Sequence, residues 1–81
     1  MISVEIAQNE LDLRGLVCPM PVLRVKKALK PLAPHEELTV VTDDPHAPAD
    51  IRTFAEQSGH EVVSQEEIAP GVVRHRLRHR A

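Results

Sequence analysis

The chain is poor in the residues that several classes of protein require. Its 81 residues include one cysteine, Cys18, one phenylalanine, Phe54, and no tryptophan or tyrosine. A single cysteine cannot close an internal disulfide, which excludes both the disulfide-stapled secreted class and a dithiol oxidoreductase. With so few aromatic rings the core must be aliphatic, and single-stranded nucleic acid would find almost no side chains on which to stack.

Signals for export or for a membrane are also lacking. No apolar run approaches the ~20 residues of a membrane span, and the N-terminus, MISVEIAQNELD, has no basic segment ahead of an apolar one. The net charge is −2 at pH 7, so the overall charge does not draw the chain to DNA or to an anionic membrane. We expect one domain, residues 1–81, in the reducing cytoplasm, where a lone thiol stays free.

The spacing of apolar residues predicts the order β-α-β-α-β-β. The expected strands are ELDLR (10–14), ELTVVT (37–42), HEVVSQEEI (60–68) and VVRHRLRHR (72–80). Helical spacing begins at Pro19 and ends near Lys30, and it returns after TDDP until Gly59. Two short helices cannot cover both faces of a four-stranded sheet. The expected fold is therefore α+β, a two-layer sandwich with both helices on one face of a mixed sheet, built from about residues 10–79.

Cys18 is expected where the first strand ends and the first helix starts. A helix N-terminus carries partial positive charge and free N–H groups, so we expect a lowered pKa for the thiol. Pro19 and Pro21 remove two donors and stiffen the backbone, but leave the N–H groups of Met20 and Val22.

Positive charge from Arg14, and from Lys26 further along the helix, could act in the same sense on the thiol. The alternative is a structural cysteine, because free cysteine is among the most often buried residues. A Cys–His hydrolase would need a base, and none of the five histidines lies in a recognisable catalytic context. The chemistry that remains is a thiolate that accepts a sulfane sulfur as a persulfide and passes it on.

The segment LDLRGLVCPMPVLRVKKAL resembles the TusA-type (SirA-like) sulfur carriers. Their signature is Cys-Pro-x-Pro after a Leu-Asp-x-x-Gly-Leu stretch, and here Cys18 to Pro21 follow Leu11, Asp12, Gly15 and Leu16. The likeness continues through Lys26 or Lys27, TDDP at 42–45 and Asp50-Ile51. It implies the same two-layer sandwich and a Cys18 that takes sulfur from a cysteine desulfurase or a rhodanese-like donor. It further implies relay to an acceptor protein in tRNA thiolation, molybdenum-cofactor assembly or sulfur oxidation. Such a chain is a relay protein rather than a free-standing enzyme.

Three other features are open to two interpretations. Asp44 either shapes the rim of the Cys18 site or only caps the second helix. Lys26, Lys27 and Lys30 form either a solvated helix face or a face for docking a partner. Arg74, Arg76 and Arg78 share one strand face and either sit over Glu66 and Glu67 or contact RNA, which would make the chain a small RNA-binding domain.

The sequence carries no signal for a cofactor, and a metal site is not expected. His75 and His79 are spaced to share a strand face, but a zinc ion would need further ligands that the sequence does not place. An interaction or regulatory module with a structural Cys18 is the alternative from a different functional class.

Overall fold

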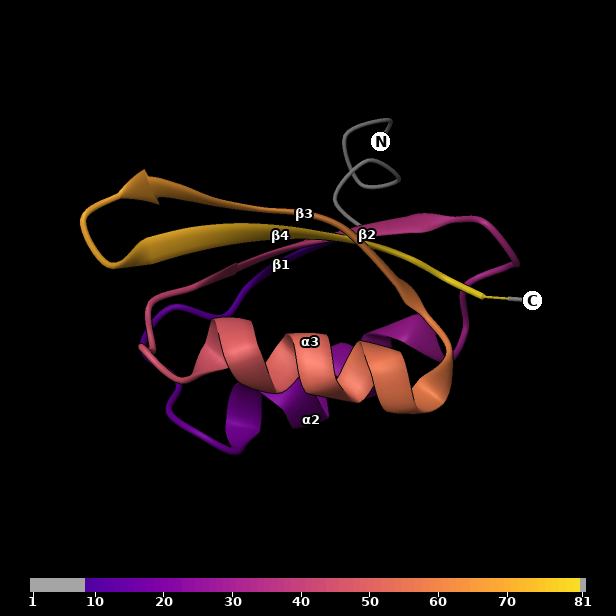
Figure 1. Cartoon of the computed structure of the whole chain (residues 1–81), viewed down its shortest axis with the longest axis horizontal. Helices are drawn as coiled ribbons and strands as arrows, with labels where there is room; N and C mark the ends of the chain where they lie inside the picture. The colour runs from indigo at the N-terminus through magenta and orange to yellow at the C-terminus, as the bar shows by residue number, and fades with distance from the viewer. Residues whose placement is uncertain (1–8, 81) are drawn as a thin grey trace, which may run out of the picture.

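The computed structural model describes residues 9–80, which form a four-stranded sheet and two helices. The elements are β1 (Glu10–Asp12), α2 (Met20–Leu29), β2 (Glu37–Thr42), α3 (Ala47–Ser58), β3 (Glu61–Ala69) and β4 (Val72–Arg78). Both helices lie against one face of the sheet and leave the other face open (Figure 1). The predicted two-layer α+β sandwich is confirmed. Residues 1–8, part of the N-terminus in which the sequence predicts no export signal, lie outside the described residues.

The strands are ordered β1-β2-β4-β3 across the sheet. β1 pairs in parallel with β2, with Leu11 opposite Val40. β4 lies between β2 and β3 and is antiparallel to both. Because β1 and β2 are parallel, the segments that leave their carboxyl ends, which contain Cys18 and the TDDP turn, emerge at the same end of the sheet.

The core between the two layers is aliphatic, as the shortage of aromatics predicts. β2 alternates buried and half-buried residues, and its buried side chains Leu38 and Val40 face the helices. The helices contribute Val25, Leu29 and Ile51, all almost fully buried. Phe54 packs at the edge of this cluster and is only partly buried.

The ends of the helices follow the chemistry of the sequence with one exception. Gly59 ends α3 in the left-handed conformation, at φ 84°, which glycine adopts without a steric penalty. Asp44 does not cap α3 with its side chain: the residue before the helix is His46, and no side chain caps the helix start. The turn into α3 is instead closed by the backbone, where the Ala47 N–H donates to the Asp44 carbonyl at 3.0 Å.

Two strands are shorter than the sequence predicts. β1 ends at Asp12, although the Leu13 N–H still donates to the Val41 carbonyl at 2.8 Å, and the chain turns at Gly15, where φ is 88°. β4 ends at Arg78, although His79 still exchanges backbone hydrogen bonds with His35 and Glu36. Within residues 9–80, neither helix has the length and apolar character needed to cross a membrane.

Candidate functional site

The loop that carries Cys18 and the turn between β2 and α3 are tied together by a hydrogen bond. The Gly15 N–H donates to Asp43 Oδ1 at 2.9 Å, across 28 residues of sequence. The positive φ of Gly15 lets the backbone turn at this point. The parallel pairing of β1 and β2 thus places the lone thiol beside an acidic turn.

Cys18 is exposed and its thiol has a carboxylate partner. The Sγ atom donates to Asp50 Oδ2 at 3.3 Å. Asp50 lies in the first turn of α3, and Cys18 lies two residues before the start of α2. The starts of the two helices therefore each contribute one member of this pair. The exposure of the thiol is the opposite of the burial that a structural cysteine would show.

The carboxylates around Cys18 reverse the expected effect on its pKa. The hydrogen bond to Asp50 raises the pKa of the thiol above its ordinary value, and partial desolvation and the negative charges of Asp50 and Asp44 act in the same direction. The prediction of a lowered pKa is therefore wrong for the isolated chain. The sequence reasoning counted the helix start but not the second helix, whose Asp50 folds back against the thiol.

The two prolines and Met20 form the start of α2 as predicted, but one donor is not free. Pro21 is buried in the first turn, and Pro19 immediately precedes the helix. The Met20 N–H donates to the Val17 carbonyl at 2.9 Å. It is therefore used within the loop and does not point at the sulfur as a free donor.

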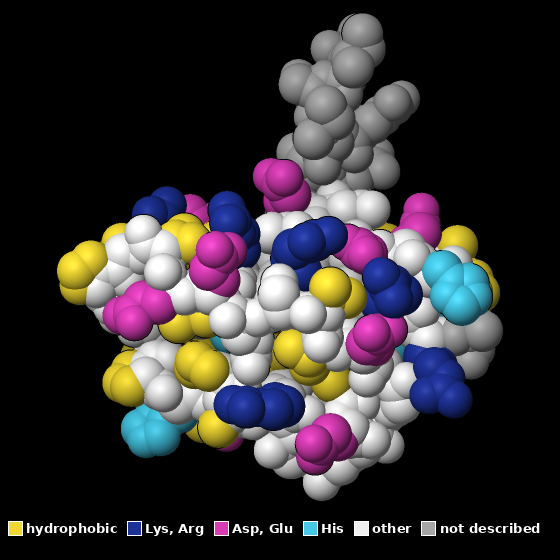
Figure 2. All heavy atoms as spheres, turned by 45° about the horizontal axis from the view of Figure 1, so that its top comes forward, with side chains coloured by type: hydrophobic (Ala, Val, Ile, Leu, Met, Phe, Trp, Pro, Cys, Tyr) yellow, Lys and Arg dark blue, Asp and Glu magenta, His cyan; other side chains and the backbone are white. Residues whose placement is uncertain are grey.

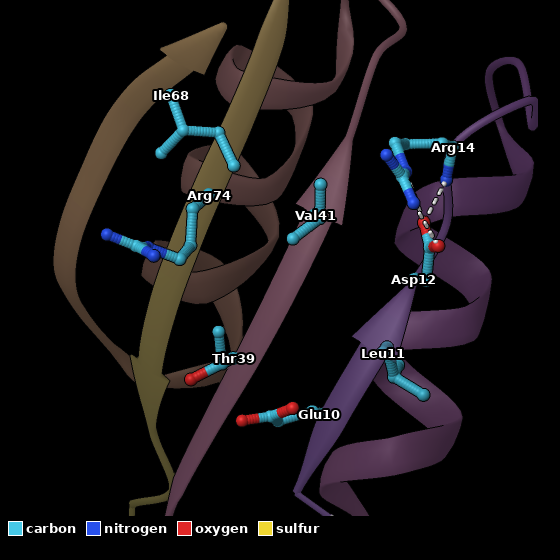
Figure 3. Close-up of a pocket in the computed structure, with 8 residues that line it drawn as sticks. All are labelled: Glu10, Leu11, Asp12, Arg14, Thr39, Val41, Ile68 and Arg74. Carbon is cyan, nitrogen blue, oxygen red and sulfur yellow. Dashed lines mark hydrogen bonds and ion pairs between the residues drawn. The ribbon is translucent and has the colours of Figure 1, made fainter. Parts of the chain in front are cut away.

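Arg14, which was expected to bring positive charge to the thiol, is paired with Asp12 instead. Its guanidinium donates from Nε to Asp12 Oδ1 at 2.9 Å and from Nη2 to Asp12 Oδ2 at 2.7 Å. This pairing lowers the pKa of Asp12 to about 2. The pair lies at the rim of a hollow of about 490 Å³ on the open face of the sheet, whose lining residues are drawn in Figure 3. Val41 and Thr39 form the floor of this hollow, with Ile68 and Arg74 on its far side.

The side chain of Asp44, whose charge acts on Cys18, is largely buried. It is 8% exposed, and no lysine or arginine of the described chain pairs with it; the His46 ring lies nearby, with Nδ1 3.9 Å from Asp44 Oδ1. The other oxygen, Oδ2, is buried and has no hydrogen-bond partner among residues 9–80. A buried polar atom without a partner is rare in folded proteins and costly to maintain.

The helix α2 presents both apolar and basic side chains at the surface. Met20 and Leu23, in the first turn of α2, are 36% and 50% exposed, and Val17, which immediately precedes Cys18 in the chain, is 66% exposed. Lys26, Lys27 and Lys30 are exposed further along the helix and form no ion pair within the described part of the chain. The surface around the thiol is therefore partly apolar, and the predicted docking lysines lie beyond it.

The arginines of β4 are matched by glutamates across the open face of the sheet. Arg74 pairs with Glu66 at 2.8 Å, Arg76 with Glu37 at 2.7 Å, and Arg78 with both Glu37 and Glu61 at 3.1 and 2.9 Å. Figure 2 shows blue and magenta side chains next to one another on this face. Glu67, the other partner expected, instead accepts the Gly71 N–H in the hairpin turn. A surface of mixed sign lacks the excess positive charge with which proteins bind nucleic-acid phosphates.

A buried polar cluster beneath the acidic turn was not expected from the sequence. His75 is fully buried, with Nε2 at 2.8 Å from Thr42 Oγ1 and Nδ1 at 3.1 Å from Gln65 Nε2. Gln65 also donates to the Pro48 carbonyl in α3 at 2.9 Å. Burial lowers the pKa of His75 to about 4. The alternation in β4 placed His75 opposite the arginines, but nothing in the sequence showed which polar groups would meet it.

The comparisons with known proteins agree with this fold and with the resemblance of the Cys-Pro-x-Pro segment to the TusA-type sulfur carriers. The family model described as Sulfurtransferase TusA matches residues 9–79. The Sulfur carrier protein TusA of Allochromatium vinosum is 41% identical over 59 residues, 73% of this chain and 78% of that protein. A Methanocaldococcus jannaschii protein named as a candidate sulfur carrier is 50% identical over 62 residues, 76% of this chain and 83% of its own.

Among solved structures, the crystal structure of a SirA-like protein from Desulfitobacterium hafniense superposes with a TM-score of 0.78 at 30% identity. The match covers 89% of this chain and 97% of that one. Sequence and structure thus point the same way: the chain belongs to the TusA sulfur-carrier family.

Proposed function

We propose that Cys18 accepts a sulfane sulfur as a persulfide from a donor protein and passes it to an acceptor protein. The observation that carries the proposal is the exposure of the lone thiol in a chain with no second cysteine. An exposed sulfur can meet the sulfur of another protein directly. Without a second thiol in the chain, no internal disulfide can form and discharge the persulfide.

The transfer balances without an added oxidant or reductant. Cys18 Sγ attacks the outer sulfur of the donor persulfide, and a new S–S bond forms as the S–S bond of the donor breaks. The donor sulfur leaves as a thiolate and takes up the proton that Cys18 has lost. In the second transfer an acceptor thiolate attacks the outer sulfur on Cys18, and Cys18 leaves as the thiolate and is protonated again.

The donor fits the class of cysteine desulfurases or rhodanese-like proteins, and the acceptor is a protein that uses sulfur in tRNA thiolation, molybdenum-cofactor assembly or sulfur oxidation. A reducing compartment such as the cytoplasm suits this role, because the thiol must be free to receive sulfur. The surface around Cys18 suits contact between proteins, since Val17 and Leu23 are large exposed apolar side chains.

Loading with sulfur tests the proposal. The reduced protein is incubated with a cysteine desulfurase and cysteine, or with a rhodanese and thiosulfate, and its mass is measured. We expect a gain of one sulfur atom that dithiothreitol removes and that Cys18→Ser does not show. Failure of the wild-type chain to gain sulfur from either class of donor would overturn the proposal.

A further inference from the structure

Two carboxylates act on the Cys18 thiol, and neither is neutralised within the described chain. Asp50 accepts the thiol hydrogen bond, and the charge of Asp44 reaches the same sulfur. Among residues 9–80 no lysine or arginine pairs with Asp44 or Asp50. The nearby arginine, Arg14, is committed to Asp12. The site therefore holds negative charge where the proposed chemistry needs a thiolate.

Asp44 is a second carboxylate at this site that lacks a hydrogen-bond donor and a counter-charge within the described residues. Its side chain is 8% exposed, and its buried Oδ2 has no partner among residues 9–80. A buried carboxylate without a hydrogen-bond donor or a counter-charge is costly, so a positive group placed close to it would lower that cost.

A metal ion is a poorer candidate for this position than an organic cation. Among the described residues, no group of three or more histidine, cysteine, aspartate or glutamate side chains is arranged to hold a metal. The flanking surface, which includes Val17, Met20 and Leu23, is exposed and apolar, as expected where another protein docks.

We propose that Asp44 and Asp50 receive a positively charged side chain, a lysine ammonium or an arginine guanidinium, from the protein with which Cys18 exchanges sulfur. The inference rests on the proposed function, since it names the chemistry of that partner. In the free chain, the carboxylates keep the thiol protonated and slow to react. The partner's cation pairs with Asp50, offsets the charge of both carboxylates and stabilises the Cys18 thiolate at the moment of transfer.

Small disulfides of different charge test this without any donor protein. Cys18 of the reduced chain attacks cystamine (cationic), 2-hydroxyethyl disulfide (neutral) or 3,3′-dithiodipropionate (anionic), forming a mixed disulfide and releasing a thiol that takes up the proton. Each rate is divided by the rate of 2-mercaptoethanol with the same disulfide, which removes intrinsic differences between the reagents.

For the wild-type chain, we expect the normalised rate with cystamine to be roughly five- to tenfold higher than the normalised rate with the neutral disulfide. The normalised rate with the anionic disulfide should be the lowest of the three. Asp50→Asn and Asp44→Asn should each reduce this preference to about twofold or less. Glu56→Gln, an exposed change of the same net charge on the same helix, should leave it intact. The wild-type preference should also shrink as salt is added, which tests the inference even if Asp44→Asn fails to fold.

Equal normalised rates for the three reagents, or a preference that survives in both Asp44→Asn and Asp50→Asn, would overturn the inference. Its failure is distinct from that of the proposed function. A chain that gains sulfur but shows no charge preference refutes only the cation site. A chain that prefers cystamine but takes no sulfur from any donor retains the cation site and refutes the carrier role.

Discussion

The Cys18 thiol donates to the Asp50 carboxylate at 3.3 Å, across 32 residues of sequence. This pair brings together the starts of both helices and sets the resting state of the thiol. The hydrogen bond raises the pKa of Cys18, so little of it is thiolate at neutral pH in the free chain. Exposure and reactivity are thus separate properties here. The thiol can be reached, but it is not activated until something changes its surroundings.

Replacing Asp50 with asparagine should activate the thiol. The amide carries no charge, so the pKa of Cys18 falls and the thiolate fraction at pH 7 rises. We expect alkylation by iodoacetamide, a neutral reagent, to become faster on the order of tenfold. The rate is measured from pH 6 to 10 by mass spectrometry, with Glu56→Gln as the charge-matched control. A pH profile for Asp50→Asn identical to the wild type would show that this carboxylate does not control the thiol.

Acid should destabilise the fold through His75. Its pKa is lowered from 6.5 to about 4 by burial. Above pH 6.5 the histidine is neutral in both states and stability is unaffected. As the pH falls from 6.5 to 4, the unfolded chain binds a proton that the folded chain does not, so the free energy of unfolding decreases by about 3 kcal/mol.

Urea denaturation at intervals across this range measures the effect. Because carboxylates also titrate near pH 4, the informative quantity is the difference between the wild type and His75→Gln, which should lose most of the pH dependence between 6.5 and 5. A wild-type stability that is flat over this interval would contradict the assignment of His75 as a buried neutral group.

Gly15 should be needed for its backbone conformation. It lies at φ 88°, where its N–H donates to Asp43 and joins the Cys18 loop to the acidic turn. A Cβ at this position would meet no atom within 4 Å, so any cost of alanine is conformational and not a clash. We expect Gly15→Ala to lower the free energy of unfolding by about 1 kcal/mol, and Gly15→Asn to lower it less, because asparagine tolerates positive φ. Chemical denaturation compares them, and an alanine variant as stable as the wild type would contradict this role.

Glu37 should organise the charged face of the sheet. It accepts from Arg76 at 2.7 Å and from Arg78 at 3.1 Å, and these bonds lower its pKa. Glu37→Gln should lower the melting temperature by roughly 1–4 °C at low salt, with a smaller difference in high salt. Glu56→Gln again serves as the control. A difference that does not depend on salt would show that the side chain acts by packing and not by charge.

The fold was largely predictable because its signals are local. The β-branched, apolar run ELTVVT predicted β2 with its observed bounds, and Gly59 marked the end of α3. The sequence was less informative about the ends of the strands: β1 and β4 both stop two residues earlier than predicted.

The site was less predictable because it depends on groups that meet only in the folded chain. Cys18 could be identified from its position before a helix, and its place beside the TDDP turn followed from parallel strands. The sequence did not reveal that Asp50, on the second helix, would reach the sulfur and raise its pKa. Nor could it show that the Met20 N–H would be used by Val17, or that His75 would be buried among polar groups. Asp50 was visible only as part of the resemblance, with no role attached.

If Cys18 both receives and releases sulfur, a chase experiment will follow the same sulfur atom through both transfers. The wild-type chain is loaded with labelled sulfur, separated from its donor, and mixed with an excess of a thiol-containing acceptor under anaerobic conditions. We expect the label to stay on Cys18 until the acceptor is added and then to move to the acceptor with a matching loss from the chain, while Cys18→Ser never carries label. Label that never binds Cys18, or that binds and cannot be moved by any acceptor thiol, would contradict the proposed carrier role.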